Sequence, residues 1–138
     1  MKTFGPPLFV VLVFAVIVLS CGTSPSSHTL QSVAVNPASA DAQGYPNGQV
    51  PFTATGYFDS QPSPVTPIAV TWGACYQGST TADVTVSAAG LAQCAPGASG
   101  VFTIWGFAPD QKNEMCGAIN ACGGGCGRIT GTAQLTCP

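Results

Sequence analysis

Residues 49–58 read Gln49-Val50-Pro51-Phe52-Thr53-Ala54-Thr55-Gly56-Tyr57-Phe58, and their pattern decides the fold class. Apolar and polar side chains alternate here with a period of two, which is typical of a β-strand with one buried and one solvent-facing side. We expect the buried side to carry Val50, Phe52, Ala54 and Phe58, and the other side to carry Gln49, Thr53, Thr55 and Tyr57.

Similar short runs of β-branched and aromatic residues recur along the chain, separated by clusters of Gly, Pro, Asn and Ser. Turn signals spaced roughly 8 to 15 residues apart indicate an all-β sandwich or barrel. No stretch has the stripe of apolar residues that an amphipathic helix needs. The expected strands are residues 30–35, 50–58, 67–72, 82–87, 91–94, 100–107 and 129–136.

The strand expected at 100–107 has apolar residues on both sides. Phe102 and Ile104 lie on one side, and Val101, Trp105 and Phe107 on the other. Two interpretations stay open for the second side, because the loop that follows could cover it or it could face solvent. In the second case Trp105 and Phe107, with Tyr57, would form an aromatic binding face for sugar rings or a protein partner.

The first twenty residues have the features of an export signal. Lys2 precedes an apolar run from Leu8 to Leu19, which is shorter than the ~20 residues that a membrane-spanning helix needs. The run leads into Val18-Leu19-Ser20-Cys21, which resembles the lipobox of bacterial lipoproteins, although Leu19 is a less usual residue at its position. An ordinary signal peptide cleaved near Ser20 or Ser27 is the alternative.

The lipobox resemblance implies that Cys21 becomes the first residue of the mature chain and carries fatty acyl chains such as palmitate. These chains would anchor the protein to a membrane without a spanning helix. Gly22 after the lipobox implies the outer membrane of a bacterium with two membranes. We therefore expect a lipoprotein-type signal peptide at 1–20, a flexible tether at 21–29 and a single folded domain at 30–138.

The cysteine count fits this interpretation. Of the 7 cysteines in the chain, lipidation of Cys21 leaves an even number, as expected for disulfides in an oxidising compartment. A metal site is not expected, because there is no Cys-x-x-Cys pair and no histidine in the domain. No cofactor is expected either. The predicted disulfide cysteines are Cys75, Cys94, Cys116, Cys122, Cys126 and Cys137.

The expected strands divide these cysteines into two sets. The first set lies at strand ends at one pole of the domain and contains Cys75, Cys94 and Cys137. The second set, Cys116, Cys122 and Cys126, lies in the long segment 108–128. Since both sets are odd, at least one disulfide must join them, and the segment must fold back along the domain. We favour a bridge between Cys75 and Cys94, and the other pairings stay open.

Several short motifs in order resemble the bacterial Ig-like domain of group 2. They are Leu30-Gln31-Ser32-Val33-Ala34-Val35-Asn36-Pro37, Gly48 before residues 50–56, Val70-Thr71-Trp72, Val84-Thr85-Val86-Ser87 with Gly90-Leu91, Pro96-Gly97 with Thr103-Ile104, and Gly131-Thr132-Ala133 before Leu135. The resemblance implies an immunoglobulin-like two-sheet sandwich of about seven strands, without catalytic residues and common in surface adhesins. It also implies that Trp72 points inward from the third strand.

The chain departs from this pattern in two places. Neither 50–58 nor 100–107 contains a cysteine, so the central disulfide of antibody domains is missing and the bridges are expected outside the core. The segment between the last two strands is roughly twenty residues long, where a hairpin loop takes about 2–5. The predicted fold is thus an Ig-like sandwich with a long, disulfide-rich loop before its last strand.

Composition and residue types exclude several functions. Only 6% of the residues are charged, which is too few for a nucleic-acid surface. The single histidine, His28, lies in the tether, and Asp110 and Glu114 in the loop are expected to be solvated, so we expect no enzyme. We expect a lipid-anchored cell-envelope protein whose domain serves adhesion or binds a surface protein or polysaccharide. A structural envelope lipoprotein without a specific ligand is the alternative.

Overall fold

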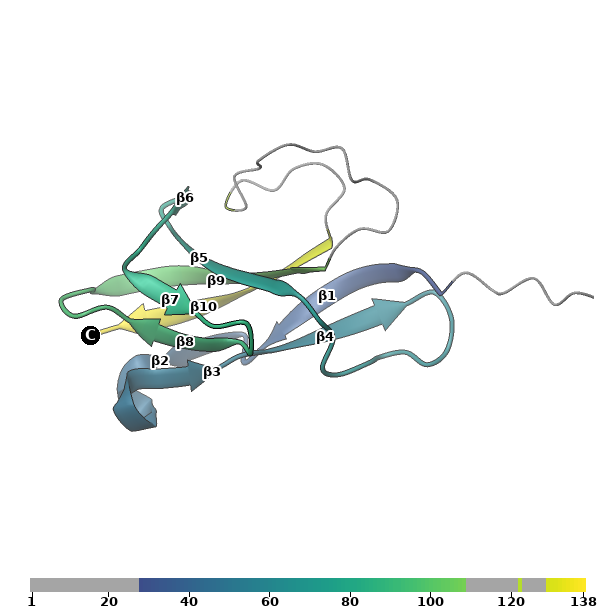
Figure 1. Ribbon diagram of the computed structural model, residues 1–138, viewed down its shortest axis with the longest axis horizontal. Coiled ribbons are helices and arrows are strands. Elements are labelled where there is room, and N and C mark those ends of the chain that lie inside the picture. The colour runs from purple at the N-terminus through teal and green to yellow at the C-terminus, as the bar shows by residue number, and fades with distance from the viewer. Residues whose placement is uncertain (1–27, 109–121, 123–128) are drawn as a thin grey trace, which may run out of the picture.

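The computed structural model describes residues 28–108, 122 and 129–138, and in this part the chain is all-β (Figure 1). The predicted signal peptide, the lipobox at Cys21 and most of segment 108–128 lie outside the described residues. Within the described ranges there is no helix that could cross a membrane. The strands form three sheets arranged in two layers, an architecture that fits a β-sandwich.

The first layer is a sheet of five strands. Their order is β2 (Ser39–Asp41), β10 (Ile129–Cys137), β9 (Gly100–Ala108), β5 (Thr71–Tyr76) and β6 (Ser79–Thr80). The long strand β9 pairs antiparallel with both β10 and β5, whereas β2 runs parallel to β10. The predictions for β9 and β10 are confirmed to within a residue, and the short strands β2 and β6 were not predicted.

The second layer consists of two smaller sheets. In one, β1 (Leu30–Asn36) pairs with β4 (Thr53–Phe58), and in the other β8 (Leu91–Cys94) lies between β3 (Gln49–Pro51) and β7 (Val84–Val86). The prediction of one continuous strand over 50–58 is wrong, because the backbone leaves the ladder at Phe52. The Phe52 N–H donates instead to the carbonyl of Gly90 at 2.8 Å, so β3 and β4 pair with different strands.

The main hydrophobic core lies between the layers. Val50, Phe52 and Ala54 are buried as predicted, whereas Phe58 is only half-buried. Thr55, expected on the wet side, is buried, and its hydroxyl lies 2.6 Å from that of Thr66. The five-stranded sheet contributes a second set of buried residues, namely Ala74, Phe102, Ile104, Ala133 and Leu135. The predicted alternation is therefore confirmed for Val50, Phe52 and Ala54, and it is wrong for Thr55.

The third predicted strand, 67–72, is shifted toward the C-terminus, since β5 begins at Thr71. The residues before it lie instead along the edge of β4, where the Ile68 N–H donates to the carbonyl of Ala54 at 3.0 Å. Trp72 packs, half-buried, against both core clusters, as expected for an inward residue.

Two disulfides link the described residues, Cys75–Cys122 and Cys94–Cys137. The favoured pairing of Cys75 with Cys94 is wrong. Ala74 belongs to the core, so its neighbour Cys75 points to the outer face of the sheet, away from Cys94 in the other layer.

The bridge between Cys75 and Cys122 confirms that a disulfide joins the two predicted sets of cysteines. The bridge between Cys94 and Cys137 connects β8 to β10 and so ties the two layers together at one end. The expectation that all bridges lie outside the core is wrong for this one, because Cys137 belongs to the main core cluster. Cys116 and Cys126 lie outside the described residues, and their disulfides stay a prediction.

Candidate functional site

The predicted aromatic face is only partly assembled. Trp105 and Phe107 are stacked on the outer face of the five-stranded sheet, with ring centroids 5.2 Å apart and planes 16° from parallel. Tyr57 lies on β4 in the other layer, where 44% of its surface is exposed. The structure therefore brings two of the three predicted residues together and leaves the third on a different sheet.

Trp105 is packed rather than presented to solvent. Only 9% of its surface is exposed, and its indole lies on Gly73, its cross-strand partner, where an added Cβ would overlap the ring. Its Nε1 is buried and finds no acceptor among the described residues. A ring covered in this way cannot stack on a ligand, so the geometry favours the packing interpretation of this face.

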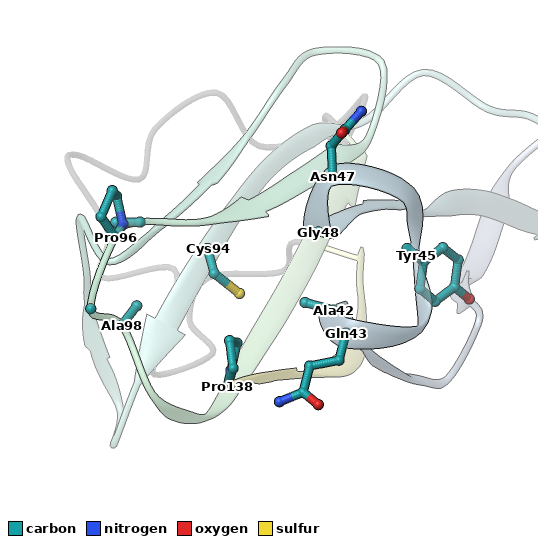
Figure 2. Close-up of a pocket in the computed structure, with 11 residues that line it drawn as sticks. Ala42, Gln43, Tyr45, Asn47, Gly48, Cys94, Pro96, Ala98 and Pro138 are labelled. Atoms are coloured by element: carbon teal, nitrogen blue, oxygen red, sulfur yellow. The ribbon is translucent and has the colours of Figure 1, made fainter.

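A groove of about 340 Å³ lies at the end of the domain where β8 and β10 terminate. Figure 2 shows the segment that contains Gln43 and Asn47 on one side, the loop with Pro96 and Ala98 on the other, and Cys94 and Pro138 between them. The full set of lining residues is Ala42, Gln43, Tyr45, Asn47, Gly48, Cys94, Ala95, Pro96, Gly97, Ala98 and Pro138.

Local sequence fixes the first wall of the groove. The wall consists of two short 3₁₀ helices, η2 (Ala42–Gly44) and η3 (Pro46–Gly48). Asp41 caps η2 by accepting a hydrogen bond from the Gln43 backbone N–H at 2.9 Å. In η3, Asn47 adopts a positive φ of 57°, a conformation that asparagine tolerates better than most residues. The wall is therefore held by its own turn chemistry.

The second wall is the loop after β8. The Ala98 N–H donates to the carbonyl of Ala95 at 3.0 Å, and Gly97 adopts a φ of 84° that suits glycine. The disulfide between Cys94 and Cys137 fixes the strand end from which this loop starts. Sequence reasoning missed the groove, although Pro46-Asn47-Gly48 and Pro96-Gly97 are both recognisable turn signals.

Most of the exposed lining of the groove is apolar, and its side chains carry no charge. None of the described residues that line it is acidic or basic. Gln43 and Asn47 carry exposed carboxamides, and Tyr45 contributes a phenol while its ring packs on the core. The rest of the lining consists of small residues, two prolines and a half-cystine. Such a surface offers hydrogen-bond donors and acceptors together with flat apolar walls.

A second, larger groove of about 580 Å³ lies beside Trp72. Its side chains are almost all apolar and come from residues 52–54, the segment before β5, Trp72 on β5 and the turn after β7. Its main side chains are Phe52, Ala54, Ile68, Val70 and Trp72. This groove offers shape and hydrophobic contact but few groups that would select one ligand over another.

His28, assigned by sequence to the tether, is tied to the domain at the start of β1. Its ring stacks on Phe58 with centroids 4.1 Å apart, and its Nε2 lies 3.1 Å from the carbonyl oxygens of both Ser60 and Pro62. Next to it, the Thr29 N–H donates to the Asp59 carboxylate at 2.9 Å. That hydrogen bond lowers the pKa of Asp59 below its ordinary value of 3.8.

The remaining predicted site residues do not gather into a reactive cluster. In the ranges 28–108, 122 and 129–138, no three His, Cys, Asp or Glu side chains lie close enough to hold a metal ion. Cys21, Asp110 and Glu114 lie outside these ranges. Neither the known protein-family models nor the curated proteins contain a match to this chain.

Proposed function

We propose that the protein is an exported, lipid-anchored module of a bacterial cell envelope, and that its domain is Ig-like and binds a partner at the cell surface. The observation that carries this proposal is the strand order. An Ig-like sandwich has strands A, B, E and D in one sheet and C, F and G in the other.

The observed strand order is compatible with that scheme, and this supports the proposal. The layer made of β1, β4, β3, β8 and β7 corresponds to A, B, E and D, with β4 and β3 as the two halves of strand B. The layer made of β10, β9 and β5 corresponds to G, F and C, and β6 takes the place of the extra strand C′ of variable-type domains. The parallel pairing of β2 with β10 extends the first strand into the second sheet.

The disulfides support export. Disulfides such as Cys75–Cys122 and Cys94–Cys137 are typical of an oxidising compartment, which agrees with the export signal predicted at 1–20. Acylation of Cys21 would place the membrane at the N-terminal end of the domain.

The position of the groove supports display. Figure 1 places the start of β1 at one end of the long axis and η2, η3 and the end of β10 at the other. A chain anchored at Cys21 enters the domain at His28, so the groove lies at the end remote from the anchor. This is the end that a surface partner meets first.

The anchor is tested by expressing the full chain with its own leader in a bacterium that has two membranes. We expect palmitate labelling and recovery in the outer-membrane fraction, both lost in Cys21→Ala and both kept in the matched control Ser24→Ala. Display is tested by adhesion of these cells to glycan-coated and protein-coated surfaces. Wild-type cells that adhere no better than cells without the protein would contradict the binding role and support the structural alternative.

A further inference from the structure

We propose that the end of the domain at which the chain enters is a docking surface for the lipid bilayer, formed by the loop 59–67 together with Tyr57. This inference rests on the proposed acylation of Cys21 and adds the orientation in which the domain stands on the membrane. It is carried by the length of the tether, the hydrogen bonding of the loop and the apolar surface that the loop exposes.

The tether between the lipid and the domain is shorter than the predicted 21–29. The His28 ring stacks on Phe58, and the Asp59 N–H donates to the Thr29 carbonyl at 3.0 Å, so the chain is fixed to the domain from His28 onward. Only residues 22–27 then separate Cys21 from His28. Even a fully extended chain covers this interval in at most about 25 Å. The bilayer therefore stays within reach of this end of the domain.

A tether of this length makes a weak attraction sufficient. Short linkers hold the two groups that they join at an effective concentration in the millimolar range. A surface whose affinity for lipid would be negligible in an unanchored protein is then occupied for much of the time. The end of the domain needs only a modest apolar surface and a low cost of desolvation.

The cost of desolvation is low because the polar groups of the loop are engaged within the domain. The Ser63 hydroxyl accepts a hydrogen bond from the Phe58 N–H at 2.9 Å, and the Ser63 N–H donates to the Gln61 carboxamide at 3.1 Å. The loop also contains three residues that have no N–H, namely Pro62, Pro64 and Pro67. Few donors therefore lose their water when the loop meets lipid.

The same end exposes apolar side-chain surface. Pro62 and Pro64 are exposed, and Val65 is half-buried. Near the end of β4, 44% of the surface of Tyr57 is exposed. Tyrosine suits the boundary between lipid and water, because its ring is apolar and its hydroxyl can stay hydrated. In Figure 1 the end of β4 and the loop that follows it lie at the end where the chain enters.

The charge at this end indicates which lipid it suits. The carboxylate of Asp59 is exposed, and the described part of the chain contains no Lys or Arg that could offset it. Anionic headgroups would repel this carboxylate. A zwitterionic lipid surface avoids the repulsion, so we expect docking to be favoured on phosphatidylcholine over phosphatidylglycerol.

The test uses the full acylated chain, isolated from a bacterium with two membranes, labelled with ¹⁵N and placed in phosphatidylcholine nanodiscs. The measurement is the transverse relaxation of the backbone amides of β9 and β10. A docked domain tumbles with the disc, whereas a domain that is only tethered tumbles by itself and relaxes more slowly. We expect relaxation at the rate of the disc in phosphatidylcholine, and a smaller docked fraction in discs rich in phosphatidylglycerol.

The variant Tyr57→Ser/Pro64→Ser should lower the ratio of docked to free domain about tenfold, because it removes much of the apolar surface that the lipid buries. The matched control is Tyr76→Ser/Pro96→Ser, which changes exposed residues of the same types away from the anchored end and should stay docked. A cooperative thermal transition in each variant shows that it is folded.

Three results would overturn the inference: the acylated wild type tumbles independently of the phosphatidylcholine disc, Tyr57→Ser/Pro64→Ser stays docked, or both double variants lose docking equally. Stronger docking on phosphatidylglycerol would overturn the choice of a zwitterionic surface. The proposed anchor has a separate readout, which is the mass of the N-terminal peptide. An unacylated Cys21 refutes the anchor and the inference together, whereas an acylated chain that tumbles freely refutes the docking surface alone.

Discussion

Replacing Trp105 with alanine should lower the free energy of unfolding by about 3–5 kcal/mol, the cost of removing a packed aromatic side chain. The indole is 9% exposed, lies on Gly73 and stacks on Phe107, so its removal leaves a cavity that the sheet backbone cannot close. If Trp105 instead formed a solvent-facing platform, the same change would cost little.

The variant Trp105→Phe distinguishes the stability due to ring packing from the cost of the buried indole N–H. The buried Nε1 of the wild-type indole has no acceptor among the described residues, and an unsatisfied buried donor costs about 1–3 kcal/mol. Phenylalanine removes this donor, keeps a ring against Phe107 and loses part of the packed volume. These effects oppose each other, so we expect Trp105→Phe to stay within about 1 kcal/mol of the wild type.

The assay is urea unfolding followed by far-ultraviolet circular dichroism, which does not depend on the tryptophan being changed. The control is Tyr57→Ala, which truncates an aromatic residue that is 44% exposed and should cost less than Trp105→Ala. A loss of less than about 1 kcal/mol for Trp105→Ala, with an unchanged slope against urea, would refute the packing argument.

Three further results are expected. The double variant Cys94→Ala/Cys137→Ala should have a free energy of unfolding about 4 kcal/mol lower than the wild type in a urea titration, because the bridge closes a loop with a sequence separation of 43. Non-reducing peptide mapping that finds Cys94 joined to another cysteine would contradict the pairing. Gly73→Ala should lower the free energy of unfolding by about 1–3 kcal/mol, since the new Cβ overlaps the indole of Trp105. A melting temperature equal to that of the wild type would count against the contact between Gly73 and Trp105. The pKa of Asp59 is lowered in the folded state, so its ionised carboxylate stabilises the fold above pH 3.8, and this contribution is lost as the pH falls through the folded-state pKa. The stability of Asp59→Asn should therefore depend less on pH in this range. An NMR titration giving Asp59 a pKa at or above 3.8 would contradict the role of the Thr29 hydrogen bond.

The sequence was most informative where strands pair regularly. The bounds of β9 and β10 are predicted to within a residue, and the period of two along β10 also predicts its buried residues, because that strand has one face on the core. On β9 both faces are apolar, so the sequence left open whether Trp105 is buried. It failed at Phe52, where the backbone N–H bonds to the Gly90 carbonyl. That hydrogen bond joins residues far apart in the chain, so the alternation of residues 49–58 cannot predict it.

The disulfides, too, were predicted from the sequence only in part. Their odd numbers in two sets predicted a bridge across the sets, which Cys75–Cys122 confirms. The partner of Cys75 depended on which face of its strand it occupies, and the strand was expected to end before that residue. The groove was missed for a related reason, since its two walls are ordinary turns whose approach depends on how strands β8 and β10 terminate together.

The alignment of the strands with the long axis has a mechanical consequence (Figure 1). A pull applied between His28 and the groove acts along the strands and therefore loads their hydrogen bonds in shear, so that many bonds must fail at once. The Cys94–Cys137 crosslink prevents the two layers from sliding apart at the pulled end. The described part of the domain therefore resists extension along its long axis better than extension across it.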